Sequence, residues 1–190
     1  MNNLRLLQSA ACALTLLASL GFACAQPATP APAKPATAAV PKVGDKAPLV
    51  SGKNQDGKTW KLADAIGKKI VVLYFYPKDD TPGCTKEACG FRDAMADFKK
   101  NGAEVIGVSF DDEASHKKFI EKHNLNFSLL ADTDGKVADA YGVRISGGNK
   151  ARRVSFLIDK DGKIAHVTDS PQADTHLNEM KAGIEKLKGK

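Results

Sequence analysis

Cysteine is scarce in this chain, and no two cysteines have the Cys-x-x-Cys spacing. The 190 residues contain four cysteines, one tryptophan and four histidines. The missing Cys-x-x-Cys pair argues against a dithiol redox motif of that type. The formal charge is +6, but the basic residues form no long run with interleaved aromatic residues. This pattern favours a solvated surface and argues against nucleic-acid binding.

The apolar stretch near the N-terminus is too short for an ordinary membrane span. It covers residues 10–23, whereas a spanning helix needs ~20 apolar residues. Arg5 is the only charge before an A-x-A cleavage site at residues 23–25. These features predict a signal peptide at residues 1–25, export to a bacterial periplasm and no stable membrane insertion after cleavage. A lipoprotein modified at Cys24 is the alternative, although the residues before it fit that signal poorly.

A proline- and alanine-rich segment, residues 26–42, separates the signal peptide from the remaining chain. This composition predicts an extended, semi-rigid linker. Residues 43–190 then suffice for one domain with a hydrophobic core. Cleavage of the signal peptide would leave Cys84 and Cys89 as the two cysteines of the mature chain.

Strand and helix patterns alternate through this domain. Two short extended segments are expected around a turn at residues 54–57. Further strands are expected at 70–76, 103–110, 127–131, 154–159 and 164–167, and helices at 82–100, 111–124, within 132–142, and at 174–188. This alternation, closed by a hairpin and a helix, predicts an α/β protein of thioredoxin-like fold, with a central mixed sheet flanked by helices.

Cys84 is predicted to lie in the first turn of the helix that follows the apolar strand at 70–76. Pro82 suits that turn, because its missing N–H group has no partner there in any helix. Unpaired backbone N–H groups at a helix N-terminus favour a thiolate over a thiol. The position therefore indicates a reactive cysteine at the end of a buried strand.

Cys89 follows Cys84 by five residues. In an intact α-helix this spacing separates the two Cα atoms by ~8.6 Å, which exceeds the ~7 Å limit for a disulfide. The two sulfur atoms can bond only if the segment unwinds, which indicates a redox cycle with a conformational step. A structural disulfide, common in exported proteins, is the alternative for this pair.

The motif Pro77-x-x-x-Thr81-x-x-Cys84 resembles that of the peroxiredoxins. The longer string from Tyr76 to Cys89, Tyr-Pro-Lys-Asp-Asp-Thr-Pro-Gly-Cys-Thr-Lys-Glu-Ala-Cys, is similar to the bacterioferritin comigratory protein, or Q-type, branch. The resemblance extends over about residues 43–188. It implies a peroxidase that reduces hydrogen peroxide and organic hydroperoxides. Cys84 would form a sulfenic acid, Cys89 would resolve it as a disulfide, and a thioredoxin-like protein or another thiol would restore both thiols.

The residues around Cys84 have expected roles in this chemistry. Thr81 can place its hydroxyl beside the sulfur and the peroxide, and backbone N–H groups near Gly83 can donate to the substrate oxygen. Pro82 would shield the site from water, and Pro77 is expected to line it. Two further residues of the motif, Lys86 and Glu87, flank the site and are expected to tune solubility or partner docking, without a catalytic part.

The resemblance also implies a cation beside the thiolate. Peroxiredoxins use an arginine just before the strand here expected at 154–159, and Arg153 occupies this position. Its forked donors could hold the thiolate and polarise the peroxide together. Arg152 should point to the other face of an extended chain, and Arg144 is a weaker candidate.

No cofactor and no metal are expected. His116 and His123 are seven residues apart, which separates them by about 10.5 Å along a helix and disfavours a shared ion. They are expected to be surface or half-buried histidines. The enzyme is expected to be a monomer whose partners are the hydroperoxide and the thiol reductant.

Three other functions remain as alternatives. A periplasmic thiol–disulfide oxidoreductase of the same fold would be expected to carry Cys-x-x-Cys. A copper-delivery protein would need a histidine near the two cysteines, and a non-catalytic holdase-like module has no support beyond the fold. The segment 144–152 is shorter and richer in glycine than in many peroxiredoxins, which leaves substrate access open.

Overall fold

The computed structural model describes residues 38–188. The predicted signal peptide and most of the predicted linker lie outside this range. The last linker residues, 38–42, contact the domain: the Ala38 N–H donates to the Asp139 carbonyl at 3.2 Å, Val40 packs against the core and Pro41 is buried. No helix in the described part of the chain is both long enough and apolar enough to cross a bilayer.

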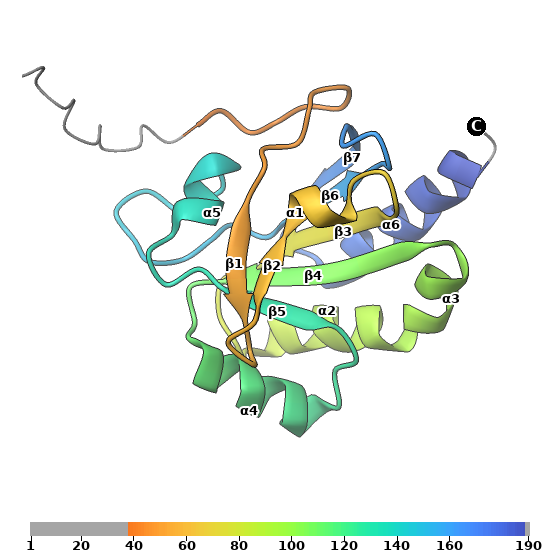
Figure 1. The fold of residues 1–190 in the computed structure, drawn as a ribbon. Coiled ribbons are helices and arrows are strands. Elements are labelled where there is room, and N and C mark those ends of the chain that lie inside the picture. The colour runs from red at the N-terminus through yellow and green to blue at the C-terminus, as the bar shows by residue number, and fades with distance from the viewer. Residues whose placement is uncertain (1–37, 189–190) are drawn as a thin grey trace, which may run out of the picture. The chain divides into compact units, whose positions relative to one another are not determined.

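A seven-stranded sheet with the order β2-β1-β5-β4-β3-β6-β7 forms the centre of the domain (Figure 1). The strands are β1 (Ser51–Asn54), β2 (Thr59–Lys61), β3 (Ile70–Phe75), β4 (Ala103–Ser109), β5 (Ser128–Ala131), β6 (Val154–Ile158) and β7 (Ile164–Asp169). Strands β3, β4 and β5 are parallel, and the other pairings are antiparallel. This mixed sheet confirms the predicted thioredoxin-like fold.

Helices cover both faces of the sheet. They are α1 (Leu62–Ala65), α2 (Pro82–Asp93), α3 (Met95–Lys100), α4 (Glu113–His123), α5 (Lys136–Ala140) and α6 (Ala173–Lys188). Apolar side chains of α2, α3, α4 and α6 pack in one core cluster, and those of α1 and α5 pack in a second cluster. Alternate residues of β3 contribute to the two clusters, because successive side chains of a strand point to opposite faces.

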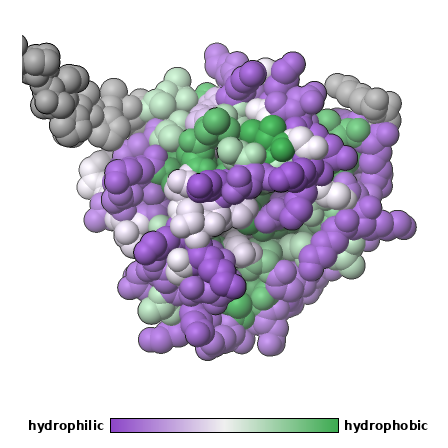
Figure 2. All heavy atoms as spheres, in the orientation of Figure 1, coloured by the Kyte–Doolittle hydropathy of each residue, from purple (hydrophilic) through white to green (hydrophobic). Residues whose placement is uncertain are grey.

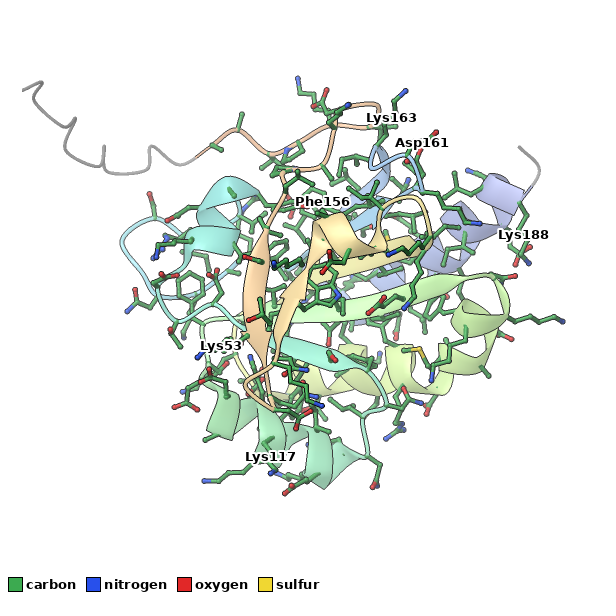
Figure 3. All side chains as sticks on the ribbon, viewed as in Figure 1. Lys53, Lys117, Phe156, Asp161, Lys163 and Lys188 are labelled. Carbon is green, nitrogen blue, oxygen red and sulfur yellow. The ribbon has the colours of Figure 1, made fainter. Side chains whose placement is uncertain are left out.

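The central position of β3 explains its apolar sequence. All six of its residues are buried, since β4 and β6 pair with its two edges and helices cover its two faces. Phe156 of β6 lies inside the domain, whereas Lys117, Lys163 and Lys188 lie at the periphery (Figure 3). Hydrophilic side chains dominate the face shown in Figure 2, with smaller apolar areas between them.

The structure differs from the sequence-based expectation in two local features. The helix expected from residue 82 to 100 is two helices, because the chain turns at Ala94 between α2 and α3. The four-residue helix α1 was not predicted, and its Leu62 is fully buried. In α2, Ala88 and Phe91 are buried and face the core. The break at Ala94 therefore leaves the placement of Cys84 unchanged.

Candidate active site

Cys84 lies in the first turn of α2, the helix that follows β3. The chain leaves β3, forms a loop at residues 77–81, and enters α2 with Thr81 as the N-cap and Pro82 in the first turn. The Cys84 side chain is 2% exposed and belongs to the same apolar cluster as Tyr76. The predicted location of the thiol is thus confirmed by the structure.

Arg153 contacts this thiol from the residue before β6. Its Nη2 donates to the Cys84 Sγ at 3.2 Å. The neighbouring Arg152 points elsewhere and forms an ion pair with Asp169 at 2.5 Å. Of the three arginines that the sequence offered, Arg153 is therefore the one that the fold brings to Cys84.

Arg144, the third candidate, contacts α5 and the residue that follows β4. Its guanidinium pairs with Asp139 at 2.6 Å and lies 4.7 Å from the centre of the Phe110 ring. These contacts hold the guanidinium between a carboxylate and an aromatic face. They give Arg144 a structural position apart from the thiol.

Glu87 is a site residue that the sequence interpretation missed. Its side chain is buried, and the Arg153 Nη1 donates to the Glu87 Oε2. A role in solubility does not fit this position. Burial raises the pKa of Glu87 to about 7, although the charge of Arg153 and its hydrogen bond act in the opposite direction. The available signal was the spacing: Glu87 is three residues after Cys84, which places both side chains on one face of a helix.

Lys86, by contrast, is exposed. It forms an ion pair with Asp174 of α6 at 2.5 Å, with side chains that are 63% and 66% exposed. Such a pair contributes little to stability. The expected surface position of Lys86 is therefore what the structure shows.

Thr81 lies beside the site but makes no hydrogen bond to the thiol among the interactions of the described residues. Its Oγ1 donates to the Lys78 carbonyl at 3.1 Å. Pro82 and Gly83 are exposed at the start of α2, and Pro77 is half-buried. A Cβ atom on Gly83 would lie 3.2 Å from the Arg153 Nη2, so the absent side chain leaves room for the guanidinium.

Asp79 fastens the loop 77–81 to α4. Its carboxylate accepts hydrogen bonds from Tyr76 at 2.7 Å, Ser115 at 2.8 Å and His116 at 2.9 Å. Burial alone would raise the pKa of Asp79, but these hydrogen bonds lower it below its usual value. The carboxylate therefore stays charged and holds the loop next to Cys84.

The adjacent Asp80 adds a second contact with α4. Its side chain meets Lys122 at 2.5 Å and His123 at 2.9 Å, and its φ angle of 56° marks a tight bend. His116 and His123, seven residues apart on α4, thus bind the successive carboxylates of Asp79 and Asp80. His116 is fully buried, so the prediction of a surface or half-buried position was wrong for this residue. Residues 38–188 contain no group of three side chains suited to hold a metal ion.

Cys89 is a free, half-buried cysteine on the same helix as Cys84. Both residues lie inside the intact α2, where this spacing separates the Cα atoms by ~8.6 Å. A disulfide between them therefore requires the first turns of α2 to unwind.

A shallow groove of about 380 Å³ opens beside Arg153. Its apolar lining comes from Pro77, Ile145 and Pro171, and its polar lining includes Arg152 and Asp169. Ile145 belongs to the short segment 144–152, which folds back on itself through an Ile145 N–H to Lys150 carbonyl hydrogen bond of 2.9 Å. The short segment thus forms one wall of this groove.

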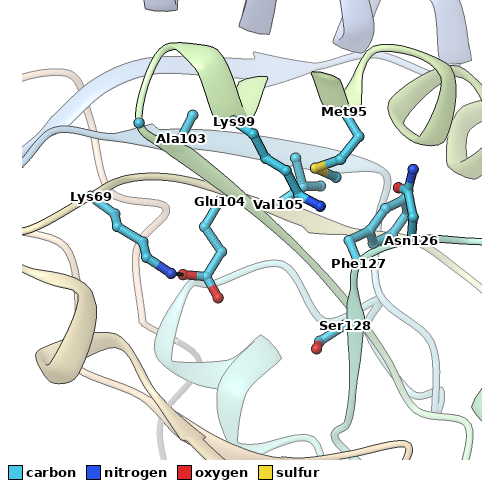
Figure 4. Close-up of a pocket in the computed structure, with 10 residues that line it drawn as sticks. Lys69, Met95, Lys99, Ala103, Glu104, Val105, Asn126, Phe127 and Ser128 are labelled. Atoms are coloured by element: carbon cyan, nitrogen blue, oxygen red, sulfur yellow. Dashed lines mark hydrogen bonds and ion pairs between the residues drawn. The ribbon is translucent and has the colours of Figure 1, made fainter. Parts of the chain in front are cut away.

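A second pocket, of about 450 Å³, lies at the other end of the parallel strands (Figure 4). Lys69 and Glu104 form an ion pair of 2.8 Å there, and Met95, Lys99 and Phe127 line it. It opens at the N-terminal ends of β3 and β4, whereas Cys84 follows the C-terminal end of β3. This pocket is therefore separate from the thiol.

Comparison with known proteins defines the class. The AhpC/TSA family matches residues 43–167, which is more than half of the chain, and the chain belongs to this family. The chain is 46% identical over 145 residues to the putative peroxiredoxin Bcp of Coxiella burnetii, covering 73% of this chain and 95% of that relative. It is 45% identical over 146 residues to the chloroplastic peroxiredoxin Q of Triticum aestivum, covering 76% and 67%.

A solved structure agrees with these relatives. The crystal structure of peroxidoxin BcpB from Mycobacterium tuberculosis matches with a TM-score of 0.73 at 35% identity, covering 77% of this chain and 97% of that one. The protein is thus a thiol peroxidase of the peroxiredoxin class, similar to Bcp and peroxiredoxin Q. These relatives give no support to the alternative of a periplasmic thiol–disulfide oxidoreductase.

Proposed function

We propose that Cys84 is the residue that attacks the peroxide and that Arg153 holds its thiolate. The observation that carries this proposal is the 3.2 Å contact between the Arg153 Nη2 and the Cys84 Sγ at the start of a buried helix. A guanidinium presents several donors in one plane, so it can bind the sulfur and a peroxide oxygen together. The relatives named peroxiredoxin Q support the thiol peroxidase activity to which these roles would belong.

The first step transfers one oxygen atom to sulfur. The Cys84 thiolate attacks one oxygen of the peroxide, the O–O bond breaks, and the other oxygen leaves with the electron pair and takes a proton from water. Cys84 becomes a sulfenic acid, and the product is water or an alcohol. Arg153 and the N–H groups near Gly83 stabilise the negative charge on the leaving oxygen. Thr81, at the N-cap, keeps its proposed role of orienting the peroxide after a rotation of its hydroxyl.

The second step forms a disulfide. The sulfur of Cys89 attacks the sulfenic acid sulfur, an S–S bond forms, and the hydroxyl leaves as water. Glu87 lies between the two cysteines and pairs with Arg153 in the intact helix, so we expect the unwinding of α2 to break this pair. A thioredoxin-type donor then reduces the disulfide, and its own dithiol becomes oxidised.

The cellular setting is part of the proposal. The predicted signal peptide, residues 1–25, indicates export to the periplasm, where the enzyme would remove hydroperoxides as a monomer. Cleavage after Ala25 would leave the described domain free of an anchor. Mass spectrometry of the N-terminus of the exported protein tests this part, because lipidation at Cys24 would add the mass of its acyl chains.

Turnover by cysteine variants tests the two thiol roles. With dithiothreitol as reductant, Cys84→Ser should lose peroxide consumption while keeping its fold. Cys89→Ser should still react with peroxide, and dithiothreitol should reduce its sulfenic acid directly, through a mixed disulfide at Cys84 that the second thiol of dithiothreitol resolves. Equal turnover by wild type and Cys84→Ser would contradict the proposal.

A further inference from the structure

A buried histidine lies behind the Arg153–Glu87 pair. His176, the fourth residue of α6, is fully buried. Its Nε2 lies 2.8 Å from the Ser170 carbonyl, and its Nδ1 lies 2.7 Å from the Ser155 Oγ. Since a carbonyl can only accept, the Nε2 carries a proton. The ring is therefore fixed at both nitrogens.

The Nδ1 edge of this ring faces Glu87. The His176 Nδ1 lies 3.5 Å from the Glu87 Oε1, which is longer than a normal hydrogen bond. The same Oε1 is buried and has no hydrogen-bond partner among the described residues, while Arg153 occupies the Oε2. An unpaired buried carboxylate oxygen is costly, so the nearby imidazole is a natural partner for it.

We propose that His176 is a positioning residue of the peroxidase: by holding the Glu87 Oε1, it orients the carboxylate that orients Arg153 against Cys84. This inference rests on the proposed roles of Cys84 and Arg153. It places the C-terminal helix α6 behind the site, in a row that runs from Ser155 through His176, Glu87 and Arg153 to the sulfur.

Several titratable or charged groups surround Glu87 and determine where a proton can bind within this row. Glu87 faces Arg153 from the start of β6, His176 from α6, Tyr74 from β3 and Cys84 on its own helix. Burial raises the pKa of Glu87 to about 7. One proton therefore binds near neutral pH to Glu87, where it can bridge to His176.

His176 has charged neighbours of its own. Burial lowers its pKa, the hydrogen bond to the Ser170 carbonyl acts in the opposite direction, and Arg153 adds to the lowering. Asp169 of β7 and Glu179 of α6 both favour the protonated ring. With the proton of the neutral ring on the Nε2, the Nδ1 can accept a hydrogen bond from a protonated Glu87.

The row also links α6 to the redox cycle. Glu87 lies between Cys84 and Cys89, so disulfide formation removes it from both Arg153 and His176. His176 then stabilises the intact helical form of α2, in which the thiolate reacts with peroxide, relative to the unwound form.

Stopped-flow oxidation of the reduced protein by hydrogen peroxide, from about pH 5 to about pH 9, tests the proposal. The protein is purified after expression of the full chain. His176→Leu removes both ring nitrogens at similar volume, and His176→Asn retains a polar group near the position of the Nδ1. His166→Leu is the matched control, because His166 also faces α6, through Glu179 at 2.9 Å, but is 38% exposed.

We expect His176→Leu to lower the rate constant about tenfold at neutral pH through misplacement of Arg153. The midpoint that reports the ionisation of Glu87 should move downward by about half a pH unit, because the protonated carboxyl group loses the Nδ1 that accepts its hydrogen bond. His176→Asn should restore part of both effects, and His166→Leu should change neither. A folded His176→Leu protein with the wild-type midpoint would overturn the proposal, whatever its rate.

Ser155→Ala decides the case if His176→Leu fails to fold. It removes the hydroxyl that competes with Glu87 for the lone pair of the Nδ1, so it should shift the midpoint in the opposite direction; an unshifted profile overturns the proposal. The wild-type rate separates this inference from the proposed function. A wild-type protein without peroxide reactivity contradicts the function, whereas a reactive wild type with unaffected variants contradicts only the role of His176.

Discussion

Arg153 and Glu87 are 66 positions apart in the sequence and form a buried ion pair directly behind the Cys84 sulfur. One nitrogen of the guanidinium binds the carboxylate, and the other binds the thiol. The carboxylate thereby fixes the plane of the guanidinium, and the remaining donors can face a peroxide. The pair joins α2 to the residue that precedes β6.

Replacement of Arg153 should reduce the reaction with peroxide more than it reduces stability. For Arg153→Lys, we expect the second-order rate constant to fall by about 10²-fold, since the ammonium cannot bind sulfur, carboxylate and peroxide in one plane. Stopped-flow oxidation measures this rate. Arg152→Lys is the matched control, because Arg152 pairs with Asp169 and should leave the rate within about twofold.

The ionisation of Glu87 should make stability depend on pH. Its pKa rises from an ordinary 4.5 to about 7 in the folded protein, with burial as the main cause. Its contribution is therefore complete below about pH 4.5 and is lost as the pH rises through about 7, for a total of up to about 3 kcal/mol. Urea unfolding of the reduced protein across this range measures the loss.

Glu87→Gln should remove this part of the pH dependence. The amide keeps the shape of the carboxyl group and cannot ionise. Exposed Glu121→Gln on α4 serves as the control and should retain the wild-type dependence. Identical stability profiles for wild type and Glu87→Gln would show that Glu87 does not titrate in this window.

Asp79→Asn should loosen the loop that leads to Cys84. The substitution weakens three hydrogen bonds to a buried carboxylate and should lower the free energy of unfolding by about 1–3 kcal/mol. Because the pKa of Asp79 is lowered in the folded protein, its contribution is present above about 3.8 and is lost as the pH falls through the lowered value. Thermal unfolding of Asp79→Asn and of the more exposed Asp80→Asn compares the two contacts; an equal or larger loss for Asp80→Asn contradicts the account.

Gly83→Ala should disturb the guanidinium without disturbing the helix. The added Cβ would lie 3.2 Å from the Arg153 Nη2, so the side chain must shift by a few tenths of an ångström. We expect the rate with hydrogen peroxide to fall by about threefold to tenfold, with helicity unchanged by circular dichroism. Gly148→Ala is the control, because its Cβ would meet only the Ile145 carbonyl oxygen at 3.8 Å. Equal rates for the two alanine variants would show that the absent side chain at Gly83 is not needed to place the Arg153 guanidinium.

Local patterns predicted the elements that position Cys84. The apolar run of β3, Pro82 in the first turn and the apolar face of α2 are all visible in neighbouring residues. The resemblance pointed to Arg153, and the fold brings it to the sulfur. The sequence was enough for these predictions because each depends on the periodicity of neighbouring residues or on a motif.

The contacts behind Arg153 could not be predicted in the same way. Whether Glu87 is buried depends on how β6 and α6 pack against α2, and a charged residue next to exposed Lys86 gives no local sign of burial. His176 is likewise unremarkable in the sequence of α6. The roles of His116 and His123 depend on the loop 77–81 folding over α4, which the spacing of the two histidines cannot show.

The most direct test of the account is the mass of the reduced protein after one equivalent of hydrogen peroxide. The account predicts a product about 2 Da lighter than the dithiol, with one peptide link between Cys84 and Cys89 after digestion. The Cys84→Ser variant should show no change in mass. A product without a Cys84–Cys89 link would contradict the assignment of the resolving thiol. Oxidation that persists in Cys84→Ser would contradict the assignment of the attacking thiol.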